Sequence, residues 1–414
     1  ETYFQPLLQE LLKRVLDHNK RVQEAACSAF ALVEEAAGPA LVPYLGPILQ
    51  NLMFAYGKYQ AKNLLILYDA IGTLAEAVGP ALAQAEAMQV LMPPLFAKWQ
   101  AVPDQDRALI PLLECLTSIA QALGPAFAEF AQPVLARCLA LIQANLAQPA
   151  GAAGAGGDFL DAEFIVCSLD LVSGMTEGMG AAIEPLFQQS NLVQLLYACC
   201  CRPEADVRQS AFAFVGDLAK GCPAVLTPAL AQLLPVLSSN LNPELVQVCN
   251  NAAWALGEIS VKVGTEMRPY VNDIVQQLVP TMGKRQLNKS LLENTAITIG
   301  RLGLIAPDVV APHLETFIEP WCNSMRNIRD DTEKEHAFRG LCEVIKVNPR
   351  GVVQRFGSLC DAIASWEKPP PELDDMFRQI LVGYKASVPP ESWQQYYATF
   401  PDYIRVRLTE RYQI

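Results

Sequence analysis

Acidic side chains recur at two fixed distances before a series of glycines, and carboxylates spaced this way could together bind cationic groups. Ten residues before the glycine stand, in chain order, Ser28, Asp69, Glu114, Asp170, Ala211, Trp254 and Glu293. Three residues before it stand Glu35, Glu76, Gln121, Glu177, Leu218, Val261 and Gly300. Residues seven apart lie two turns apart on one face of an α-helix. The pattern therefore predicts helices on which two acids, or an acid and an amide, lie two turns apart on the same face. When such helices stack side by side, these faces would align into an acidic strip.

A solvated outer face is the plain alternative for such a strip, because most surface charges only contact water. Neighbouring like charges repel when no cation lies between them, and ordinary surface helices alternate lysine with glutamate. Few lysines fall on the face that carries these acids. We therefore favour a strip that faces a cationic partner. We expect it on the concave side of the helix stack, where repeat proteins bind extended ligands.

A different pattern follows further along the chain, in the segment Val-Cys-Asn-Asn-Ala-Ala-Trp at residues 248–254. Asn250 and Trp254 lie one helical turn apart, and asparagine is a poor helix former, so two in mid-helix need an explanation. One explanation is a peptide-binding surface, in which the amides pair with the backbone of an extended segment and Trp254 offers an apolar platform. The other is a core tryptophan beside asparagines that bond a neighbouring turn. The pattern alone favours neither.

Catalytic and metal-binding residues form no recognisable motif in this sequence. The three histidines, His18, His313 and His336, are far apart and stand in no HExxH or catalytic-triad context. We expect His18 and His336 to be exposed, since they flank charged segments. Carboxylates on one face could in principle act as acid and base or hold a metal ion, but no histidine or ligand-spaced cluster accompanies them. The sequence therefore predicts a protein that is not an enzyme and has no cofactor or metal.

The acids are positioned by helices that repeat with a period near forty residues. The glycines that close these helices, at spacings of 41, 45, 56, 41, 43 and 39 residues, are Gly38, Gly79, Gly124, Gly180, Gly221, Gly264 and Gly303. Glycine after a helix end adopts the left-handed cap conformation, and the apolar residues between the glycines recur at helical spacing. HEAT and armadillo repeats have periods of about 40–47 residues. We predict an all-α fold, a right-handed superhelical solenoid of HEAT repeats with about nine helix pairs.

A single array is expected to run through residues 1–414. Its one long spacing contains the segment 147–157, whose glycine- and alanine-rich composition cannot form a core and predicts a flexible insert loop. Beyond the last glycine we expect two further helix pairs, at about 306–348 and 350–388. The aromatic residues of the segment 389–414 suit a C-terminal cap that covers the last exposed core face.

Charge and cysteine content restrict the partners and the compartment. With 31 Lys and Arg against 43 Asp and Glu, the net charge is −12, which disfavours nucleic acid and anionic lipid and favours basic partners. The 12 cysteines include no CxxC pair, and the run Cys199–Cys201 lies in an apolar stretch, so we expect buried free thiols and a reducing compartment. No uncharged, proline-free apolar run reaches the length of about 18 residues that a membrane span needs. Because residue 1 is Glu, we expect a fragment of a longer chain.

Five segments of the chain carry a family resemblance. They are LLILYDAIGTL (64–74), VRQSAF (207–212), NNAAWALGEIS (250–260), LLENTAITIGRLG (291–303) and RNIRD (326–330). They resemble the karyopherin-beta family of nuclear import receptors, and within it the transportin group. The resemblance runs from about Thr2 to the end, with a clear departure only at the glycine- and alanine-rich insert. It implies that the chain corresponds to the C-terminal half of such a receptor, the arch that binds cargo.

The resemblance implies a role for particular positions in binding a cargo signal that contains a proline-tyrosine pair. An arginine upstream of that pair would meet Glu24, Ser28, Glu35, Asp69, Thr73 and Glu76, the last of which stands where the family usually has aspartate. The basic or hydrophobic N-terminal part of the signal would meet Asp170, Glu177, Gln209, Asp217, Val246, Asn250, Asn251, Trp254, Asn294 and Ile297. Val246 and Ile297 would flank Trp254 with apolar surface. The resemblance thus favours the peptide-binding explanation of the asparagines and the tryptophan.

Partners and location also follow from the resemblance. It implies cargo proteins with basic, disordered nuclear localisation signals, and nucleoporins, as partners of a receptor that shuttles between cytoplasm and nucleus. The GTPase Ran would bind an N-terminal arch that precedes residue 1, and most of the pocket for the proline-tyrosine pair would lie there too. Direct contact with nucleic acid and insertion into a membrane are not expected. The alternative is a HEAT scaffold of another class, such as a phosphatase subunit or an assembly platform, that binds partners through its loop ridges.

Overall fold

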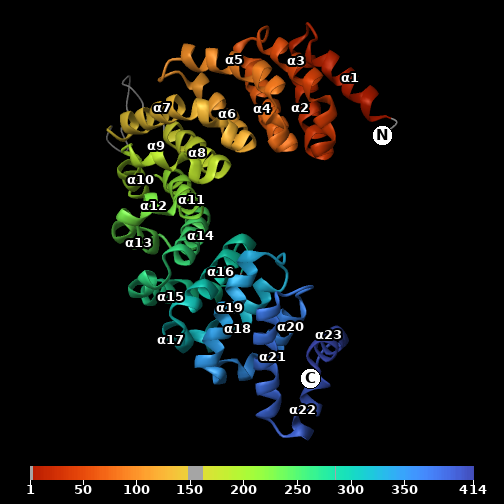
Figure 1. Ribbon diagram of the computed structural model, residues 1–414, viewed down its shortest axis with the longest axis vertical. Helices are drawn as coiled ribbons and strands as arrows, with labels where there is room; N and C mark the ends of the chain where they lie inside the picture. Colours follow the sequence, from red (N-terminus) through yellow and green to blue (C-terminus); the bar gives the residue numbers. More distant parts are fainter. Residues whose placement is uncertain (1–2, 148–161, 285) are drawn as a thin grey trace. The chain divides into compact units, whose positions relative to one another are not determined.

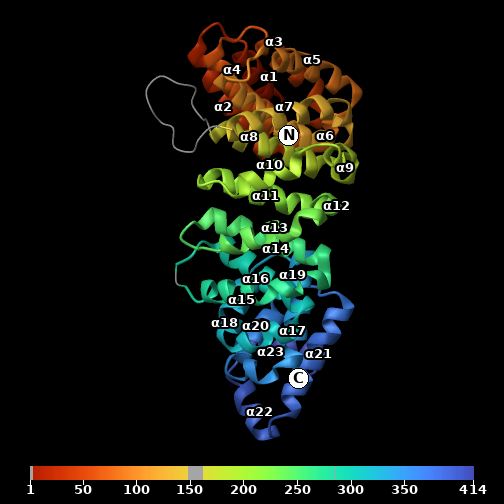
Figure 2. The same cartoon turned by 90° about the vertical axis from the view of Figure 1, so that its left-hand side faces the viewer.

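The computed structural model describes residues 3–147, 162–284 and 286–414 (Figure 1). Every regular element within these ranges is an α-helix or a 3-10 helix, in agreement with the predicted all-α HEAT solenoid. The chain divides into two compact units, the N-terminal unit Glu1–Leu226 and the C-terminal unit Thr227–Ile414. Within each unit the helices follow one another in chain order (Figure 2).

The N-terminal unit has two layers of helices. One layer consists of α2, α4, α6, α8 and α11, each packed against the next, and the other contains α3, α5, α7 and α10 (Figure 1). The α-helices are α1 (Phe4–Val15), α2 (Lys20–Ala37), α3 (Leu45–Tyr56), α4 (Ala61–Val78), α5 (Ala85–Ala101), α6 (Ile110–Leu123), α7 (Ala128–Leu146), α8 (Ala162–Met179), α9 (Glu184–Gln188), α10 (Leu192–Cys200), α11 (Ala205–Gly221) and α12 (Pro223–Leu226). The 3-10 helices are η1 (Gly38–Tyr44), η2 (Gly79–Ala83), η3 (Arg107–Leu109), η4 (Gly124–Phe127) and η5 (Gly180–Ile183).

The C-terminal unit repeats this arrangement. Its helices α14, α16, α19 and α21 pack in sequence to form one layer, and α13, α15, α18, α20 and α23 form the other. The α-helices are α13 (Leu230–Ser239), α14 (Val246–Val263), α15 (Arg268–Met282), α16 (Lys289–Ile305), α17 (Pro307–Val310), α18 (Leu314–Met325), α19 (Thr332–Val347), α20 (Phe356–Ala364), α21 (Pro371–Ala386), α22 (Pro390–Tyr397) and α23 (Asp402–Tyr412). The 3-10 helices are η6 (Thr227–Ala229), η7 (Gly264–Met267), η8 (Ala311–His313) and η9 (Pro349–Arg355).

Side-chain caps fix where several of the layer-forming helices begin. The Asn19 side chain accepts a hydrogen bond from the backbone N–H of Arg21 at the start of α2. Asn288 caps α16 in the same way, and Asp331 accepts from the backbone N–H of Lys334 at 3.0 Å in α19. Such caps satisfy N–H groups that have no partner within the helix. They explain why short polar residues precede these helices.

The repeating glycines have two different structural roles. Five of them follow a helix with φ between 51° and 61°, as predicted, and these are Gly38, Gly79, Gly124, Gly180 and Gly264. The expectation was wrong for the other two, since Gly221 is the last residue of α11 and Gly303 lies inside α16. A Cβ atom on Gly303 would lie 2.9 Å from the backbone oxygen of Gly340 in α19. Here the glycine is needed for close helix packing and not for a turn.

Free cysteines contribute to the core of both units, as expected. Eleven of the twelve are buried, and none forms a disulfide. The exception is Cys201, which follows the last residue of α10 and is exposed, so the prediction of a buried run is wrong at its third position. Burial raises the pKa of the Cys199 thiol to about 12, which keeps it protonated. The buried thiols therefore act as small apolar groups.

Three stretches of the N-terminal unit are long and apolar enough to span a membrane by length and composition, although each of them contains charged residues and prolines. They are Lys20–Tyr56, Ala61–Ala83 and Arg107–Leu146. The first consists of α2 and α3 joined by η1, which contains two prolines. The second and third also combine an α-helix with further elements of the solenoid. In this fold their apolar residues pack neighbouring helices together.

The predicted segments near the C-terminus can be placed on the structure. The range 306–348 contains α17, α18 and α19, and 350–388 contains α20 and α21. The segment 389–414 contains α22 and α23, and Trp393 within it is buried whereas Tyr403 is exposed. Apart from Ala147, the segment 147–157 lies outside the described residues.

Candidate functional site

Ten of the predicted signal-binding residues lie on one layer of the N-terminal unit. Helix α2 carries Glu24, Ser28 and Glu35, α4 carries Asp69, Thr73 and Glu76, α8 carries Asp170 and Glu177, and α11 carries Gln209 and Asp217. Glu24, Ser28, Glu35, Asp69, Glu76 and Glu177 are exposed, and the other four are partly buried. The side of this layer that carries the exposed acids is called the acidic face below. Its helices pack in the order α2, α4, α6, α8 and α11, so the acids of successive repeats are neighbours.

A cavity of about 320 Å³ between α4 and α6 brings three predicted residues together. Asp69, Thr73 and Glu76 line its α4 side, and Glu114 and Ser118 line its α6 side. The resemblance had not singled out the two α6 residues. Glu114 is one of the residues that stand ten positions before a repeating glycine, so the spacing pattern had identified it. Ser118 carried no such signal.

Hydrogen bonds on the acidic face join carboxylates to neutral side chains of the next helix. Ser118 Oγ donates to Glu76 at 2.8 Å, and the Gln121 amide donates to Glu177. Further along, Ser173 of α8 donates to Asp217 of α11. These bonds fix the orientation of the carboxylates, and their donors carry no positive charge.

Two arginines close to these helices pair with other acids. Arg107 pairs with Glu163, and Arg202 pairs with Glu204 at 2.9 Å. Within the described part of the chain, the carboxylates at positions 24, 35, 69, 76, 114 and 177 have no lysine or arginine within 4.0 Å. Among the described residues, these six carboxylates therefore have the charge to bind a cationic ligand and no lysine or arginine already paired with them.

Crowding of like charges also appears in the pKa values of the acids. Burial raises the pKa of Glu114, and the charges of Glu163 and Asp69 raise it further. Burial likewise raises the pKa of Asp170, against the effect of a hydrogen bond from Ser210. A nearby cation would lower these values. The raised pKa values are the direction that burial and neighbouring negative charges give when no cation lies close.

Glu34 of α2 is an acid that the sequence reasoning missed. Its side chain is 0% exposed, and neither carboxyl oxygen has a hydrogen-bond partner among the described residues. Burial, and then the charges of Asp69 and Glu35, raise its pKa to about 9. The spacing of Cys27, Phe30 and Glu34 could have identified it, since these three follow one buried stripe of α2.

The remaining predicted residues lie on two adjacent helices of the C-terminal unit. Val246, Asn250, Asn251 and Trp254 belong to α14, and Asn294 and Ile297 belong to α16, which packs against it. The Asn294 amide donates to Asn250 Oδ1 at 3.0 Å, and the Asn250 amide donates to Asn251 Oδ1 at 3.2 Å. The asparagines therefore bond to each other across the two helices.

Both explanations of the asparagines and the tryptophan find partial support in this geometry. The amides do bond a neighbouring helix, yet Asn250, Asn251 and Trp254 are only partly buried, so each keeps some surface. The expected apolar flanks differ, because Val246 is partly buried whereas Ile297 is only 6% exposed and belongs to the core. The surface around Trp254 thus has an apolar flank on the α14 side only.

The histidines and the possible metal ligands add no further site. His18 is exposed as expected, but His336 of α19 is partly buried, and burial together with Arg301 lowers its pKa. That expectation was wrong because α19 packs against α16, which brings Arg301 close. The described residues contain no group of three or more His, Cys, Asp or Glu side chains arranged to hold a metal ion.

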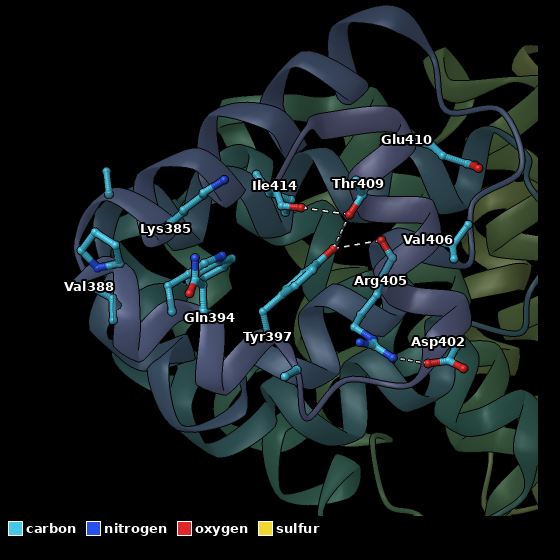
Figure 3. A pocket seen from close by; sticks show the side chains of 14 residues that line it. Lys385, Val388, Gln394, Tyr397, Asp402, Arg405, Val406, Thr409, Glu410 and Ile414 are labelled. Carbon is cyan, nitrogen blue, oxygen red and sulfur yellow. Dashed lines mark hydrogen bonds and ion pairs between the residues drawn. The ribbon is translucent and has the colours of Figure 1, made fainter.

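A larger cavity, of about 1050 Å³, lies at the last three helices and contains none of the predicted residues (Figure 3). Tyr397 stands at its centre, where its hydroxyl donates to the backbone oxygen of Arg405 at 2.9 Å and contacts Thr409 Oγ1 at 3.0 Å. The ion pair between Arg405 and Asp402 lies at its edge. Both signs of charge line it, so it does not extend the acidic face.

Comparisons with known proteins fit this architecture. A family model described as a HEAT-like repeat matches residues 205–259. Transportin-1 of Mus musculus and transportin-1 of Homo sapiens are each 52% identical to the chain over 416 residues, and the alignments cover 100% of it. The chain is a homologue of the transportins. It spans 46% of the length of these two relatives.

The fold of this transportin homologue also occurs in a more distant solved structure. Importin beta, crystallised in an ammonium sulfate condition, matches 99% of the chain and 50% of its own length with a TM-score of 0.66. At 14% sequence identity this likeness concerns the fold alone, and it confirms the predicted HEAT solenoid. The names of the relatives, transportin and importin subunit beta-2, describe transport proteins, in agreement with the prediction that the chain is not an enzyme.

Proposed function

We propose that the chain is part of a nuclear import receptor that binds the extended, basic proline-tyrosine nuclear localisation signals of cargo proteins. The observation that carries this proposal is the acidic face, where the carboxylates at positions 24, 35, 69, 76, 114 and 177 have no lysine or arginine within 4.0 Å among the described residues. A disordered segment rich in arginine would supply the cations. Homology to the transportins over the whole chain supports this choice of ligand.

Arginine side chains of the signal would bind in the cavity between α4 and α6. Asp69 and Glu76 on one wall and Glu114 on the other can surround a guanidinium group, which forms paired hydrogen bonds with carboxylates. Exposed ion pairs of this kind contribute only about 0–1 kcal/mol each. Several of them along one face would act mainly on the association rate and on selectivity for basic segments.

The part of the signal that precedes these arginines would bind the C-terminal unit as well as α8 and α11. The partly exposed amides of Asn250, Asn251 and Asn294 can pair with an extended backbone, and Trp254 can cover an apolar side chain. A peptide bound at several points gains affinity from each without one dominant contact.

Further properties belong to the same proposal. The full receptor would bind Ran through an N-terminal arch, contact nucleoporins and shuttle between cytoplasm and nucleus. Related folds have been solved as a Kap95 complex with Nup1 and as Kap121p bound to the SUMO protease Ulp1p. Residues 1–414 would form one HEAT array, 147–157 a flexible insert and 389–414 a cap.

A peptide-binding assay tests the proposal directly. A fluorescent peptide with several arginines and a proline-tyrosine pair should bind the chain, and the same peptide with citrulline in place of arginine should bind at least about tenfold more weakly, a difference of about 1.4 kcal/mol. Asp69→Lys should weaken binding of the arginine peptide by a similar factor. Glu129→Lys is the matched control, because Glu129 is exposed on α7 in the other layer.

Two results would contradict the proposal. Equal binding of the arginine and citrulline peptides would show that the acidic face does not select cations. An equal loss of peptide affinity in Asp69→Lys and Glu129→Lys would show that binding depends only on the net charge. The α4–α6 cavity would then not be the binding site.

A further inference from the structure

Glu34 occupies a place in α2 that apolar residues fill elsewhere on the same stripe. Ala26, Cys27 and Phe30 are its buried companions on this helix. The Glu34 side chain is 0% exposed and both of its oxygens lack a hydrogen-bond partner in the described part of the chain. A buried ionised carboxylate without a partner is strongly disfavoured, so the group is held as a neutral acid.

The charges that act on Glu34 are both negative. Asp69 contributes from α4, the neighbouring helix, and Glu35 contributes from α2 itself. Together with burial they raise the pKa of Glu34 to about 9, and Cys27 lies close enough for Glu34 to raise the pKa of its thiol in turn. Two acids, Asp69 and Glu35, therefore act on Glu34 where α2 packs against α4, and Glu34 itself is buried without a hydrogen-bond partner among the described residues.

Among the described residues, the other elements packed against α2 bring no compensating cation to Glu34. Helix α1 carries Glu10, Lys13 and Arg14, of which Lys13 pairs with Glu10 and Arg14 with Asp17. The 3-10 helix η1 brings Tyr44 as its titratable group. A cationic partner for these acids would therefore come from a ligand.

We propose that a guanidinium group of the bound peptide ionises Glu34 when it enters between Glu35 and Asp69, so that peptide binding releases a proton. The O–H bond of the Glu34 carboxyl group breaks, the proton passes to the buffer, and the carboxylate that remains pairs electrostatically with the guanidinium. This inference rests on the proposed function, since it requires that a basic peptide binds the acidic face. It makes Glu34 a specificity-determining residue behind the surface that the peptide contacts.

Release of a proton has a definite effect on affinity. Because Glu34 is protonated in the free protein up to about pH 9 and ionised in the complex, affinity rises with pH over the neutral range. The rise is at most about tenfold per pH unit for a single proton, and it stops above about pH 9, where Glu34 is ionised in both states. An arginine peptide does not titrate in this range.

Isothermal titration calorimetry of the chain with the arginine peptide tests this inference. Titrations at about pH 7.5 in two buffers of different ionisation enthalpy report the number of protons released, and we expect up to about one. Glu34→Gln should bind the peptide, release no proton and show an affinity that does not change between about pH 7 and pH 8. Glu35→Gln is the matched control: it should bind more weakly and still release the proton.

The outcomes separate this inference from the proposed function. Binding without proton release, or equal release by Glu34→Gln and the parent chain, would overturn the role of Glu34 and leave peptide binding intact. Failure of the arginine peptide to bind at all would contradict the proposed function instead. Glu34→Met, which replaces the acid with an apolar side chain of similar length, provides the same comparison if the glutamine variant does not fold.

Discussion

A buried acid such as Glu34 affects folding as well as binding. Its pKa of about 9 in the folded chain lies far above the ordinary value of about 4.5, so between these limits the unfolded chain has lost a proton that the folded chain keeps. The stability that this group contributes is therefore fully present only below about pH 4.5 and is lost as the pH rises towards 9. The slope is about 1.4 kcal/mol per pH unit.

Glu34→Gln should remove this pH dependence. Because glutamine does not titrate, we expect the stability of the variant relative to the parent chain to rise by about 4 kcal/mol between about pH 5 and pH 8. Urea unfolding at the two pH values measures the difference. Parallel pH profiles for both proteins would show that Glu34 is ionised in the folded chain or has a partner there.

Trp254 is the aromatic residue on which the proposed peptide surface of the C-terminal unit depends. It is partly buried, and a tryptophan anchor commonly contributes about 2–4 kcal/mol to an interface. Trp254→Ala should therefore weaken binding of the arginine peptide by about thirtyfold or more, measured by fluorescence anisotropy. Tyr270→Ala, at a partly buried aromatic residue of α15 in the other layer, should leave the affinity unchanged. An unchanged affinity in Trp254→Ala would remove this residue from the site.

At the scale of helices, close backbone contact holds α16 and α19 together. A Cβ atom on Gly340 would lie 1.8 Å from the backbone oxygen of Gly300, so Gly340→Ala must push the two helices apart. Overpacking of this kind costs about 1–3 kcal/mol, and we expect at least that loss in a denaturant unfolding experiment on the chain. Gly383→Ala in α21 is the control, because a Cβ atom there meets nothing within 4 Å and alanine favours the helix. Equal effects of the two substitutions would contradict the packing argument.

The glycines also show what could be predicted from the sequence about the elements. Their period identified a HEAT solenoid, because repeated helix pairs of one length must stack on each other. Spacing alone could not separate a glycine that ends a helix, such as Gly264, from one inside a helix, such as Gly303. That difference depends on how closely a second helix approaches, which only the three-dimensional packing determines.

On the acidic face, the relative placement of side chains along a helix was easier to predict from the sequence than their burial. The seven-residue spacing placed Asp69 and Glu76 correctly on one side of α4, because helical geometry follows directly from sequence separation. Burial was harder to predict: Glu34 stands next to an exposed Glu35, and Ile297 looked like part of the surface. Whether a side chain faces solvent depends on which neighbouring helix covers it, and a single sequence does not contain that information.

For the whole molecule, the net charge of −12 and the acidic face together would determine how the proposed basic peptide approaches. Attraction between exposed charges extends about 10 Å at 0.1 M salt and about 3 Å at 1 M salt. We therefore expect the association rate of the arginine peptide to fall steeply as salt increases, whereas the dissociation rate changes little. Stopped-flow fluorescence at several salt concentrations measures both rates. The double variant Asp69→Lys/Glu177→Lys should reduce this salt dependence. The control is the double variant Glu129→Lys/Glu266→Lys, which makes the same change of charge at two exposed acids that do not belong to the helices of the acidic face. We expect the control to reduce the salt dependence less. If the association rate depends equally on salt in the two double variants, the molecule attracts the peptide through its total charge. The arrangement of the acids on α4 and α8 would then make no contribution.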